Sequence, residues 1–288
     1  MGTGYWARVT HAPALGSTPG IKFSAVWGRD RMAADALATE YGARGHSDLD
    51  AFLADVDAVA FSVPPHVQSA IATRAATTGK HLLLEKPVAV TMVAADELAK
   101  AVSDAGVASV VFFTSRFQSD VRAWIAKVTG KDGWTGGSAA WLASALLASS
   151  PFNTPWRREK GGLWDVGPHV VSLLWASLGP VESVTADAGP ADVAHLVLHH
   201  LGGATSTATV TLSAPVAADG FDLYLWGEPG RSAAPVQAGD VVSTLRVALT
   251  ELADNARSGQ LAHPCDVHFG REVTRVLAEA QRQIDARQ

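Results

Sequence analysis

The sequence predicts an α/β domain with a parallel sheet over residues 1–114, followed by an α+β domain with a large, mostly antiparallel sheet over residues 115–288. Two observations support this division. Strands and helices alternate strictly from Ile21 onward, as a doubly wound sheet requires. After about residue 115 the segments instead alternate apolar and polar residues, with turn signals such as Gly202-Gly203 between them.

In the first domain, the expected strands cover 21–28, 44–46, 57–63, 81–87 and 107–113. The expected helices cover 30–42, 47–55, 67–80 and 91–106. The run 57–63 is uninterrupted and apolar, which is typical of a strand buried on both faces. Ahead of Ile21 stands only the helix-like stretch YWARVTHAPAL, so we expect one strand to be missing at the front of the sheet.

In the second domain, the expected strands cover 136–147, 193–201, 204–214 and 221–227. The expected helices cover 163–179, 240–258 and 270–286, and the last could pack back on the first domain. Three segments are expected to be loops: 154–164, 213–220 and 227–235.

Composition narrows the function classes. The chain has 288 residues, 48% hydrophobic residues and a formal net charge of −5, so nucleic acid and membrane surfaces are not expected partners. Its single cysteine, Cys265, cannot form an intrachain disulfide, and no leader or long apolar run is evident, which favours a cytoplasmic protein. His195, His199 and His200 make no recognisable metal site with Cys265.

The chain opens MGTGYWA, in which Gly2, Gly4 and Ala7 have the spacing of a G-x-G-x-x-A phosphate turn. Such a turn lets the backbone approach a pyrophosphate and points a helix N-terminus at its charge. The turn residues are therefore candidate cofactor-binding residues: Gly2, Thr3, Gly4, Tyr5, Trp6 and Ala7. A glycine turn with no ligand is the alternative that the motif alone leaves open.

Two further places bear on the cofactor. The strand 21–28 ends in Gly28 and Arg29, where an NAD site usually carries an acid for the ribose hydroxyls. Gly28 supplies no acid, and Arg29 is a planar cation able to bind a 2′-phosphate, so the pair favours NADP over NAD. NAD stays possible, and the alternative for Arg29 is a solvent-facing side chain. The loop 62–68, with Ser62 and Pro64, is expected to border the nicotinamide ribose.

The stretch GKHLLLEKPVAV contains Glu85-Lys86-Pro87, and Gly161-Gly162 is followed by Asp165 and His169. With the opening turn, these motifs resemble the Gfo/Idh/MocA oxidoreductases, the family of glucose–fructose oxidoreductase and inositol dehydrogenase. The resemblance extends over essentially the whole chain. It implies a Rossmann domain, a substrate domain, and Glu85, Lys86 and Pro87 at the nicotinamide.

Lys86 follows a parallel strand at the carboxyl edge, where open α/β sheets bind ligands, so it can reach both nicotinamide and substrate. Its alternative is a surface lysine that ends a strand. Asp165 and His169 stand four apart at a helix start and can share one face. Histidine suits proton transfer near neutral pH and a carboxylate would orient it, whereas a helix cap and a packed core histidine are the alternatives.

The expected loop before this pair carries Trp156, Arg157 and Trp164, candidate substrate contacts because aromatic faces suit sugar rings and arginine suits oxygen atoms. Packing and solvation are their alternatives. Many family members carry a histidine after the Pro-Pro pair at 64–65; here Gln68 stands nearest that place and His66 precedes it, so no role is assigned to His66.

Together these features predict an NADP(H)-dependent oxidoreductase that transfers hydride between nicotinamide and a secondary alcohol or ketone of a sugar, cyclitol or similar polyol. Lys86, Asp165 and His169 are the expected catalytic residues, and no metal is expected. Two alternatives stay open: a non-redox glycosidase-type enzyme that holds nicotinamide, and an inactive nucleotide-binding relative. The resemblance also implies a homodimer or homotetramer formed through the second domain's sheet.

The missing strand would lie between the strands at 21–28 and 57–63, and its absence would expose two rows of backbone amides and carbonyls. A start site chosen downstream of the strand would explain it, and so would a neighbouring segment that fills the space. For the chain as written we expect weakened cofactor binding, and we expect an upstream extension to restore stability and affinity.

Overall fold

The computed structural model describes residues 1–235 and 239–287. The chain divides into two compact units. Unit 1 comprises Met1–Phe117 and Gly239–Arg271, and unit 2 comprises Gln118–Ala238 and Glu272–Gln288. The segment Gly239–Arg271 therefore groups with the first unit, although the expected boundaries assign it to the second domain. Residues 236–238 and 288 of that expected domain lie outside the described residues.

Unit 1 contains five short parallel strands, all within the expected strand segments: β1 (Ala25–Trp27), β2 (Arg44–His46), β3 (Ala58–Ala60), β4 (His81–Leu84) and β5 (Ser109–Val111). They form two separate sheets in the orders β1-β2 and β3-β4-β5. Among the described residues no strand lies between β1 and β3, so the expected gap in the sheet is confirmed.

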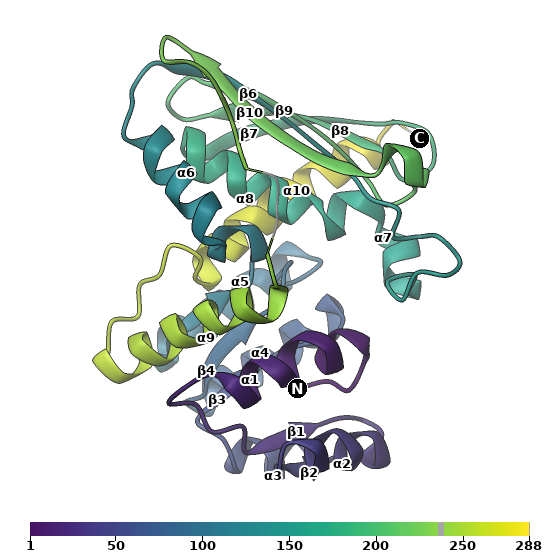
Figure 1. Ribbon diagram of the computed structural model, residues 1–288, viewed down its shortest axis with the longest axis vertical. Coiled ribbons are helices and arrows are strands. Elements are labelled where there is room, and N and C mark those ends of the chain that lie inside the picture. Colours follow the sequence, from purple (N-terminus) through teal and green to yellow (C-terminus); the bar gives the residue numbers. More distant parts are fainter. Residues whose placement is uncertain (236–238, 288) are drawn as a thin grey trace. The chain divides into compact units, whose positions relative to one another are not determined.

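Helices alternate with these strands, as Figure 1 shows. They are η1 (a π-helix, Ala7–His11), α1 (Ala12–Ser17), α2 (Arg31–Glu40), α3 (Leu49–Ala54), α4 (Pro65–Thr77), α5 (Met92–Ala105), η2 (Thr114–Phe117) and α9 (Val241–Ser258). Side-chain oxygens of Asp30, Asp48 and Thr91 accept hydrogen bonds from the first amides of α2, α3 and α5. These caps satisfy donors that a helix leaves unpaired, which explains why each helix begins where it does.

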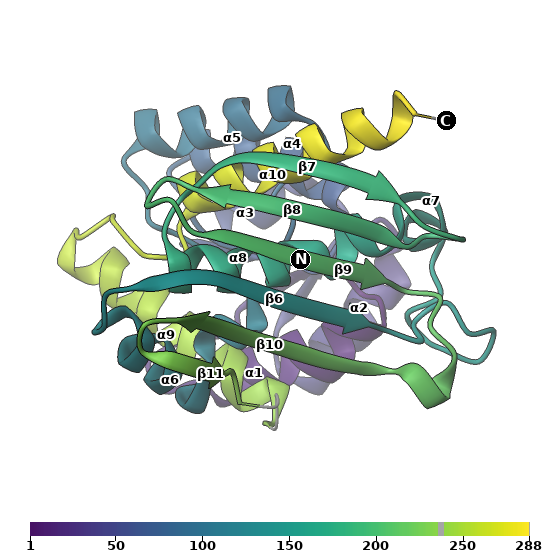
Figure 2. The same ribbon diagram turned by 90° about the horizontal axis from the view of Figure 1, so that it is seen from above.

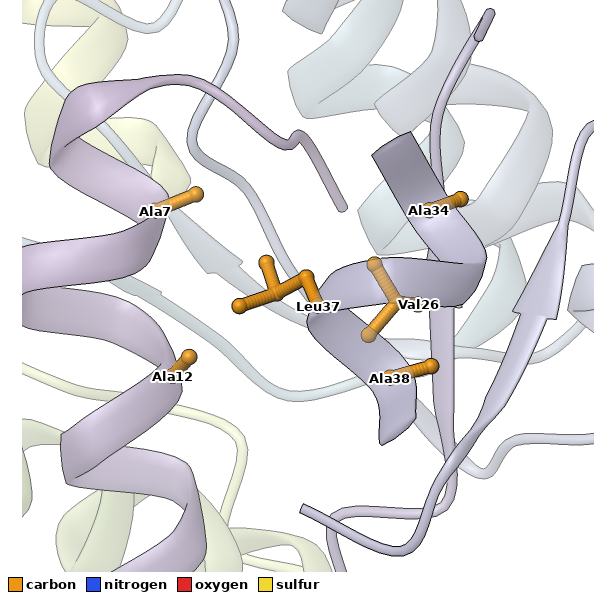
Figure 3. Close-up of a cluster of buried hydrophobic side chains, with 6 residues drawn as sticks. All are labelled: Ala7, Ala12, Val26, Ala34, Leu37 and Ala38. Atoms are coloured by element: carbon orange, nitrogen blue, oxygen red, sulfur yellow. The ribbon is translucent and has the colours of Figure 1, made fainter. Parts of the chain in front are cut away.

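Small side chains hold the opening helix close to the first sheet. Ala7 and Ala12 from η1 and α1 share a buried cluster with Val26 of β1 and with Leu37 of α2 (Figure 3). Because alanine adds only one carbon beyond the backbone, the helices can approach β1 closely. The cluster fixes the glycine turn that precedes η1.

Met1 and Gly2 bridge the two sheets at the carboxyl ends of their strands. The Met1 amino group donates to the carbonyl of Ala60 at 2.6 Å, and the Ser62 amide donates to the Met1 carbonyl at 2.9 Å. On the other side, the Gly2 amide donates to the carbonyl of Trp27 at 2.9 Å. Two residues thus make the pairing that a complete strand would make at one end of the gap.

Unit 2 is built on one six-stranded sheet in the order β11-β10-β6-β9-β8-β7 (Figure 2). Its strands are β6 (Trp134–Leu142), β7 (Val181–Ala188), β8 (Ala194–His200), β9 (Thr205–Thr211), β10 (Gly220–Gly227) and β11 (Gly230–Ala233). All neighbours are antiparallel except β6 and β9, which are parallel. The predicted large, mostly antiparallel sheet is confirmed.

The remaining helices are α6 (Ser119–Thr129), α7 (Pro155–Asp165), α8 (Gly167–Leu178), η3 (Val216–Ala218) and α10 (Val267–Asp285). Along β8 and β9, side chains such as Leu198 and Val210 are buried, and the intervening His199 and Thr207 are exposed. This alternation gives the sheet one covered face and one open face. No helix among residues 1–235 and 239–287 is long and apolar enough to cross a membrane.

Two expectations for residues 154–179 are wrong. The segment expected to be a loop forms α7, because Thr154 is extended and Pro155 occupies the first turn, where its missing amide costs nothing. The single helix expected over 163–179 is divided at Val166 into α7 and α8. Gly161 lies within α7 at φ 62°, a conformation that interrupts a helix and favours glycine.

Strand β7, strand β11 and helix α6 were also not predicted. The expected loop 227–235 contains β11, because Gly227 and Gly230 pair across a two-residue turn and the chain returns along β10. Helix α6 was not assigned, although Val121, Trp124 and Val128 bury one of its faces at helical spacing.

Candidate functional site

The glycine turn has the geometry of a phosphate cradle. Gly2 has φ 107°, and a Cβ there would collide with the carbonyl of Ser62. A Cβ on Gly4 would meet nothing within 4 Å, so its α-carbon faces open space. A pyrophosphate needs such room beside the backbone, and the residues of this turn fit the cofactor in that respect.

The end of β1 lies against the same turn. A Cβ on Gly28 would come within 2.8 Å of the Thr3 side chain, so this glycine permits the close approach of the two segments. Arg29 follows and is exposed, in line with either of its expected roles. The next acid, Asp30, accepts hydrogen bonds from the amides of Met32 and Ala33, so this carboxylate serves as a helix cap.

The loop after β3 also meets the turn, through Ser62. Pro64 immediately precedes α4 and is exposed, and so is His66. Gln68 is fully buried and holds the backbone of Glu85: its Nε2 donates to the Glu85 carbonyl at 2.7 Å, and the Glu85 amide donates to its Oε1 at 2.8 Å. In the sequence, Gln68 stands nearest the place where many family members carry a histidine, but nothing there predicted its contact with Glu85.

Lys86 follows β4 between Glu85 and a buried Pro87, and it is half-buried. The Glu85 carboxylate accepts a hydrogen bond of 2.7 Å from the indole nitrogen of Trp6, and His11 Nε2 lies 2.9 Å from the same oxygen. Trp6 belongs to the glycine turn. The structure therefore joins the turn directly to the Glu85-Lys86-Pro87 segment, which the sequence had identified as separate motifs.

In unit 2, Asp165 and His169 are both buried, on α7 and α8. Arg157 grips Asp165 with two hydrogen bonds, Nε to Oδ2 at 2.8 Å and Nη2 to Oδ1 at 3.3 Å. The His169 ring lies 5.2 Å from the Trp141 ring, tilted by 30°. Arg157 thus has a carboxylate partner, and the orientation of His169 by Asp165 stays a prediction.

The two candidate tryptophans differ in their surroundings. Trp156 is half-buried, and the Arg157 guanidinium lies 4.9 Å from its ring centre. Trp164 is only 3% exposed, and its indole nitrogen donates to Gln281 at 2.9 Å. Substrate contact stays a prediction for each, while Trp164 has a clear packing role.

Sequence reasoning missed Asp192, on the loop between β7 and β8. Its carboxylate accepts from the Gly162 amide at 2.8 Å, the Leu212 amide at 2.7 Å and the Thr211 hydroxyl at 2.7 Å. Burial alone would raise the pKa of Asp192, but these bonds together with one from Ser213 outweigh it and lower the pKa. Asp192 thereby fixes the start of the segment that carries Asp165.

The two glycines before Asp165 have packing reasons. A Cβ on Gly162 would lie 2.6 Å from Cα of Thr211, and one on Gly161 would lie 2.8 Å from Cβ of Asp192. The Gly-Gly pair therefore lets α7 approach β9 closely. Within the described part of the chain, no group of three or more histidine, cysteine, aspartate or glutamate side chains could hold a metal ion.

Residues 1–113 match the sequence model of the family described as "Oxidoreductase family, NAD-binding Rossmann fold". An uncharacterized oxidoreductase of Synechocystis sp. is 30% identical over 199 residues, which cover 65% of this chain and 52% of that protein. A levoglucosan dehydrogenase of Pseudarthrobacter phenanthrenivorans is 30% identical over 140 residues, 46% of this chain and 35% of that one. The match thus spans about half the length of the first of these relatives.

Solved structures share the fold at low sequence identity. GenD2 from gentamicin A biosynthesis, in complex with NAD, has a TM-score of 0.84 at 20% identity and covers 100% of this chain and 93% of its own. A levoglucosan dehydrogenase in complex with NADH and levoglucosan has a TM-score of 0.85 at 17% identity, with 100% and 96% covered. An oxidoreductase domain protein from Kribbella flavida has 0.85 at 22%, with 98% and 95% covered. These likenesses establish the Rossmann and mixed-sheet fold.

Proposed function

Because the chain belongs, through its residues 1–113, to the Gfo/Idh/MocA oxidoreductase family, we propose that it is a nicotinamide-dependent oxidoreductase acting on a secondary alcohol or ketone of a sugar, cyclitol or similar polyol. One observation carries the proposal: the Trp6–Glu85 hydrogen bond ties the glycine turn to the segment bearing Lys86. A phosphate-binding turn and a half-buried lysine at the end of a parallel strand are the parts that such chemistry needs.

Each proposed catalytic residue has a separate role. With its pyrophosphate held at the glycine turn, the dinucleotide would supply the hydride chemistry through its nicotinamide ring. Lys86 would stabilise the substrate oxygen as its charge changes, because an ammonium group polarises a carbonyl. His169 would take the hydroxyl proton in oxidation and return it in reduction, with Asp165 as its orienting carboxylate.

The cofactor preference is proposed to be NADP. It is supported by the exposed Arg29, by the lack of a side chain on Gly28, where an NAD site usually carries an acid, and by the use of Asp30 as a helix cap. NAD is the alternative, and the neighbours crystallised with NAD or NADH make both cofactors necessary in any assay.

The proposal is tested by mixing the protein with NADPH or NADH and a panel of ketoses and ketocyclitols while the absorbance of reduced nicotinamide is followed. We expect substrate-dependent oxidation of the cofactor, with loss of at least about 100-fold in Lys86→Ala. Full turnover in that variant would refute the mechanism. Cofactor binding without turnover on a broad panel would instead support an inactive relative.

Assembly into a homodimer or homotetramer is proposed through the open face of the unit 2 sheet. Aromatic side chains support this, because Tyr224 and the 39% exposed Trp226 lie together on that sheet with ring centres 5.7 Å apart. Light scattering on the purified protein tests it, and a monomer at micromolar concentration would contradict it.

A further inference from the structure

The Glu85 side chain is held by two residues of the opening segment, Trp6 and His11. Trp6 and His11 both reach its Oε1, at 2.7 and 2.9 Å, and the side chains of His11 and Glu85 are only 5% and 13% exposed. An ionised carboxylate only accepts hydrogen bonds, so the imidazole donates from Nε2. Two donors on one shielded oxygen fix the carboxylate more firmly than an exposed ion pair would.

The Glu85 main chain is held separately, by Gln68 of α4. Gln68 binds both its carbonyl and its amide, and Gln68 Nε2 also lies 3.3 Å from the carbonyl of Pro87. Because this amide side chain is completely buried, water cannot replace the bonds. Lys86 therefore stands between two residues whose backbone groups are bound by one glutamine.

We propose that Trp6, His11 and Gln68 are positioning residues for Lys86, and that Trp6 couples occupancy of the glycine turn to the placement of that lysine. The inference rests on the proposed function for the ligand of the turn. Trp6 stands between Gly4 and Ala7, so a phosphate group that orders the turn also orders the indole. The indole then fixes Glu85, the residue that precedes Lys86.

The Trp6→Phe variant tests the coupling, because it keeps an aromatic ring and removes the N–H donor. Trp27→Phe is the matched control: Trp27 is buried in the same unit, and its indole nitrogen has no hydrogen-bond partner among the described residues. We expect the affinity for NADPH and NADH, titrated by nicotinamide fluorescence, to fall about tenfold in Trp6→Phe, the size of a lost bond to a charged group. Trp27→Phe should stay within about twofold.

A second pair of variants distinguishes positioning from general packing. Glu85→Gln keeps an oxygen that accepts from the indole, whereas Glu85→Leu removes it. We expect Glu85→Gln to retain most of the affinity and Glu85→Leu to lose about as much as Trp6→Phe, with no further loss in the Trp6→Phe/Glu85→Leu double variant. Should Trp6→Phe fail to fold, this pair carries the test alone.

The response of Lys86 itself is read by NMR of ¹⁵N-lysine-labelled protein, with its amide resonance assigned through its loss in Lys86→Arg. Without cofactor, Trp6→Phe should move this resonance and Trp27→Phe should not. With cofactor, the shift seen in the wild type should be diminished in Trp6→Phe.

The outcomes separate the two proposals. A wild type that binds neither cofactor defeats the proposed function, and the cofactor-free resonance still decides the positioning role. A Trp6→Phe protein with wild-type affinity and an unmoved Lys86 resonance overturns the inference.

Discussion

Unit 2 holds one continuous six-stranded sheet, whereas the parallel strands of unit 1 form separate pieces of two and three strands. In unit 2, β6 pairs with β9 along the whole stretch from Gly136 to Leu142. In unit 1, Met1 and Gly2 bridge β1 and β3 at one end. In the continuous sheet, backbone hydrogen bonds between neighbouring strands are spread over many residues. In unit 1, the backbone connection between β1 and β3 depends on Met1 and Gly2.

Because the bridge between β1 and β3 uses the Met1 amino group, it has an electrostatic consequence. Its amino group is buried and donates a hydrogen bond to the Ala60 carbonyl, and burial lowers the pKa of this group from 8.0 to about 5. A peptide N–H at the same place would carry no charge to desolvate. The glycine turn, the proposed cofactor site, thus begins beside a buried amino group that forms part of the bridge between the two sheets.

The largest expected effect is a pH dependence that belongs to Met1. Above pH 8 the amine is neutral in both folded and unfolded chains, and below about pH 5 it is charged in both. Between these limits the unfolded chain binds more protons, so the free energy of unfolding should rise with pH by at most about 4 kcal/mol. Urea unfolding at several pH values measures it.

An N-terminally acetylated chain is the control, because acetylation removes this one titration and leaves every histidine in place. The acetylated protein should lose the Met1 contribution and be the more stable of the two at pH 6. Parallel pH profiles for the two proteins would show that the amino group is not buried.

The second prediction concerns the packing of α7 against the continuous sheet of unit 2. Gly162→Ala would press a methyl group against the backbone of Thr211 on β9, where no flexible side chain can yield. We expect a loss of about 3 kcal/mol in the free energy of unfolding. Gly202→Ala is the control, because a Cβ on Gly202 would meet nothing within 4 Å. Gly179 is unsuitable, because its φ of 92° would strain any substituted residue. Equal melting temperatures for the two variants would contradict the close approach.

A smaller loss is expected for Asp192→Asn, which keeps the shape but replaces one acceptor oxygen by a donor. The cost should be about 2 kcal/mol at pH 7. Because hydrogen bonds lower the pKa of Asp192, its contribution is present above the ordinary aspartate pKa and is lost as pH falls through the lowered value. The difference between variant and wild type should therefore shrink in acid. A pH-independent difference would point to packing alone.

The smallest expected effect is a change in cofactor affinity at Arg29, which follows β1 in the divided sheet of unit 1. Arg29→Ala should weaken NADPH binding about tenfold and leave NADH binding within about twofold, because only the former offers a 2′-phosphate. Arg31→Ala, on the first turn of α2, is a matched control for lost surface charge. Equal losses for both cofactors would mean that Arg29 does not read the phosphate.

The five strands of unit 1 and the division into two kinds of sheet were predictable from local patterns. The run 57–63, the glycine turn and Glu85-Lys86-Pro87 each lie within a few neighbouring residues. The gap itself followed from counting elements ahead of Ile21. Helix α7 was missed because prolines and paired glycines are typical of loops, although Pro155 begins a helix and Gly162 packs against a strand.

The supporting contacts were not predictable in this way. Gln68 meets Glu85 across 17 positions, Asp192 meets Gly162 across 30, and Trp6 meets Glu85 across 79. Trp6, Glu85 and Gly162 belong to motifs that the sequence shows, but nothing in the sequence pairs them with their partners. Tertiary packing alone brings them together, so a single chain without its structure gives no sign of them.

The most direct test of the broken ladder is thermal melting of the chain lengthened ahead of Met1 by about 5–8 strand-forming residues. The extension replaces the buried ammonium by a peptide and offers partners to the facing edges of β1 and β3. The account predicts a melting temperature raised by roughly 10 °C, together with tighter NADPH binding, relative to an extension of the same length made of glycine and serine. No gain over that control would contradict it.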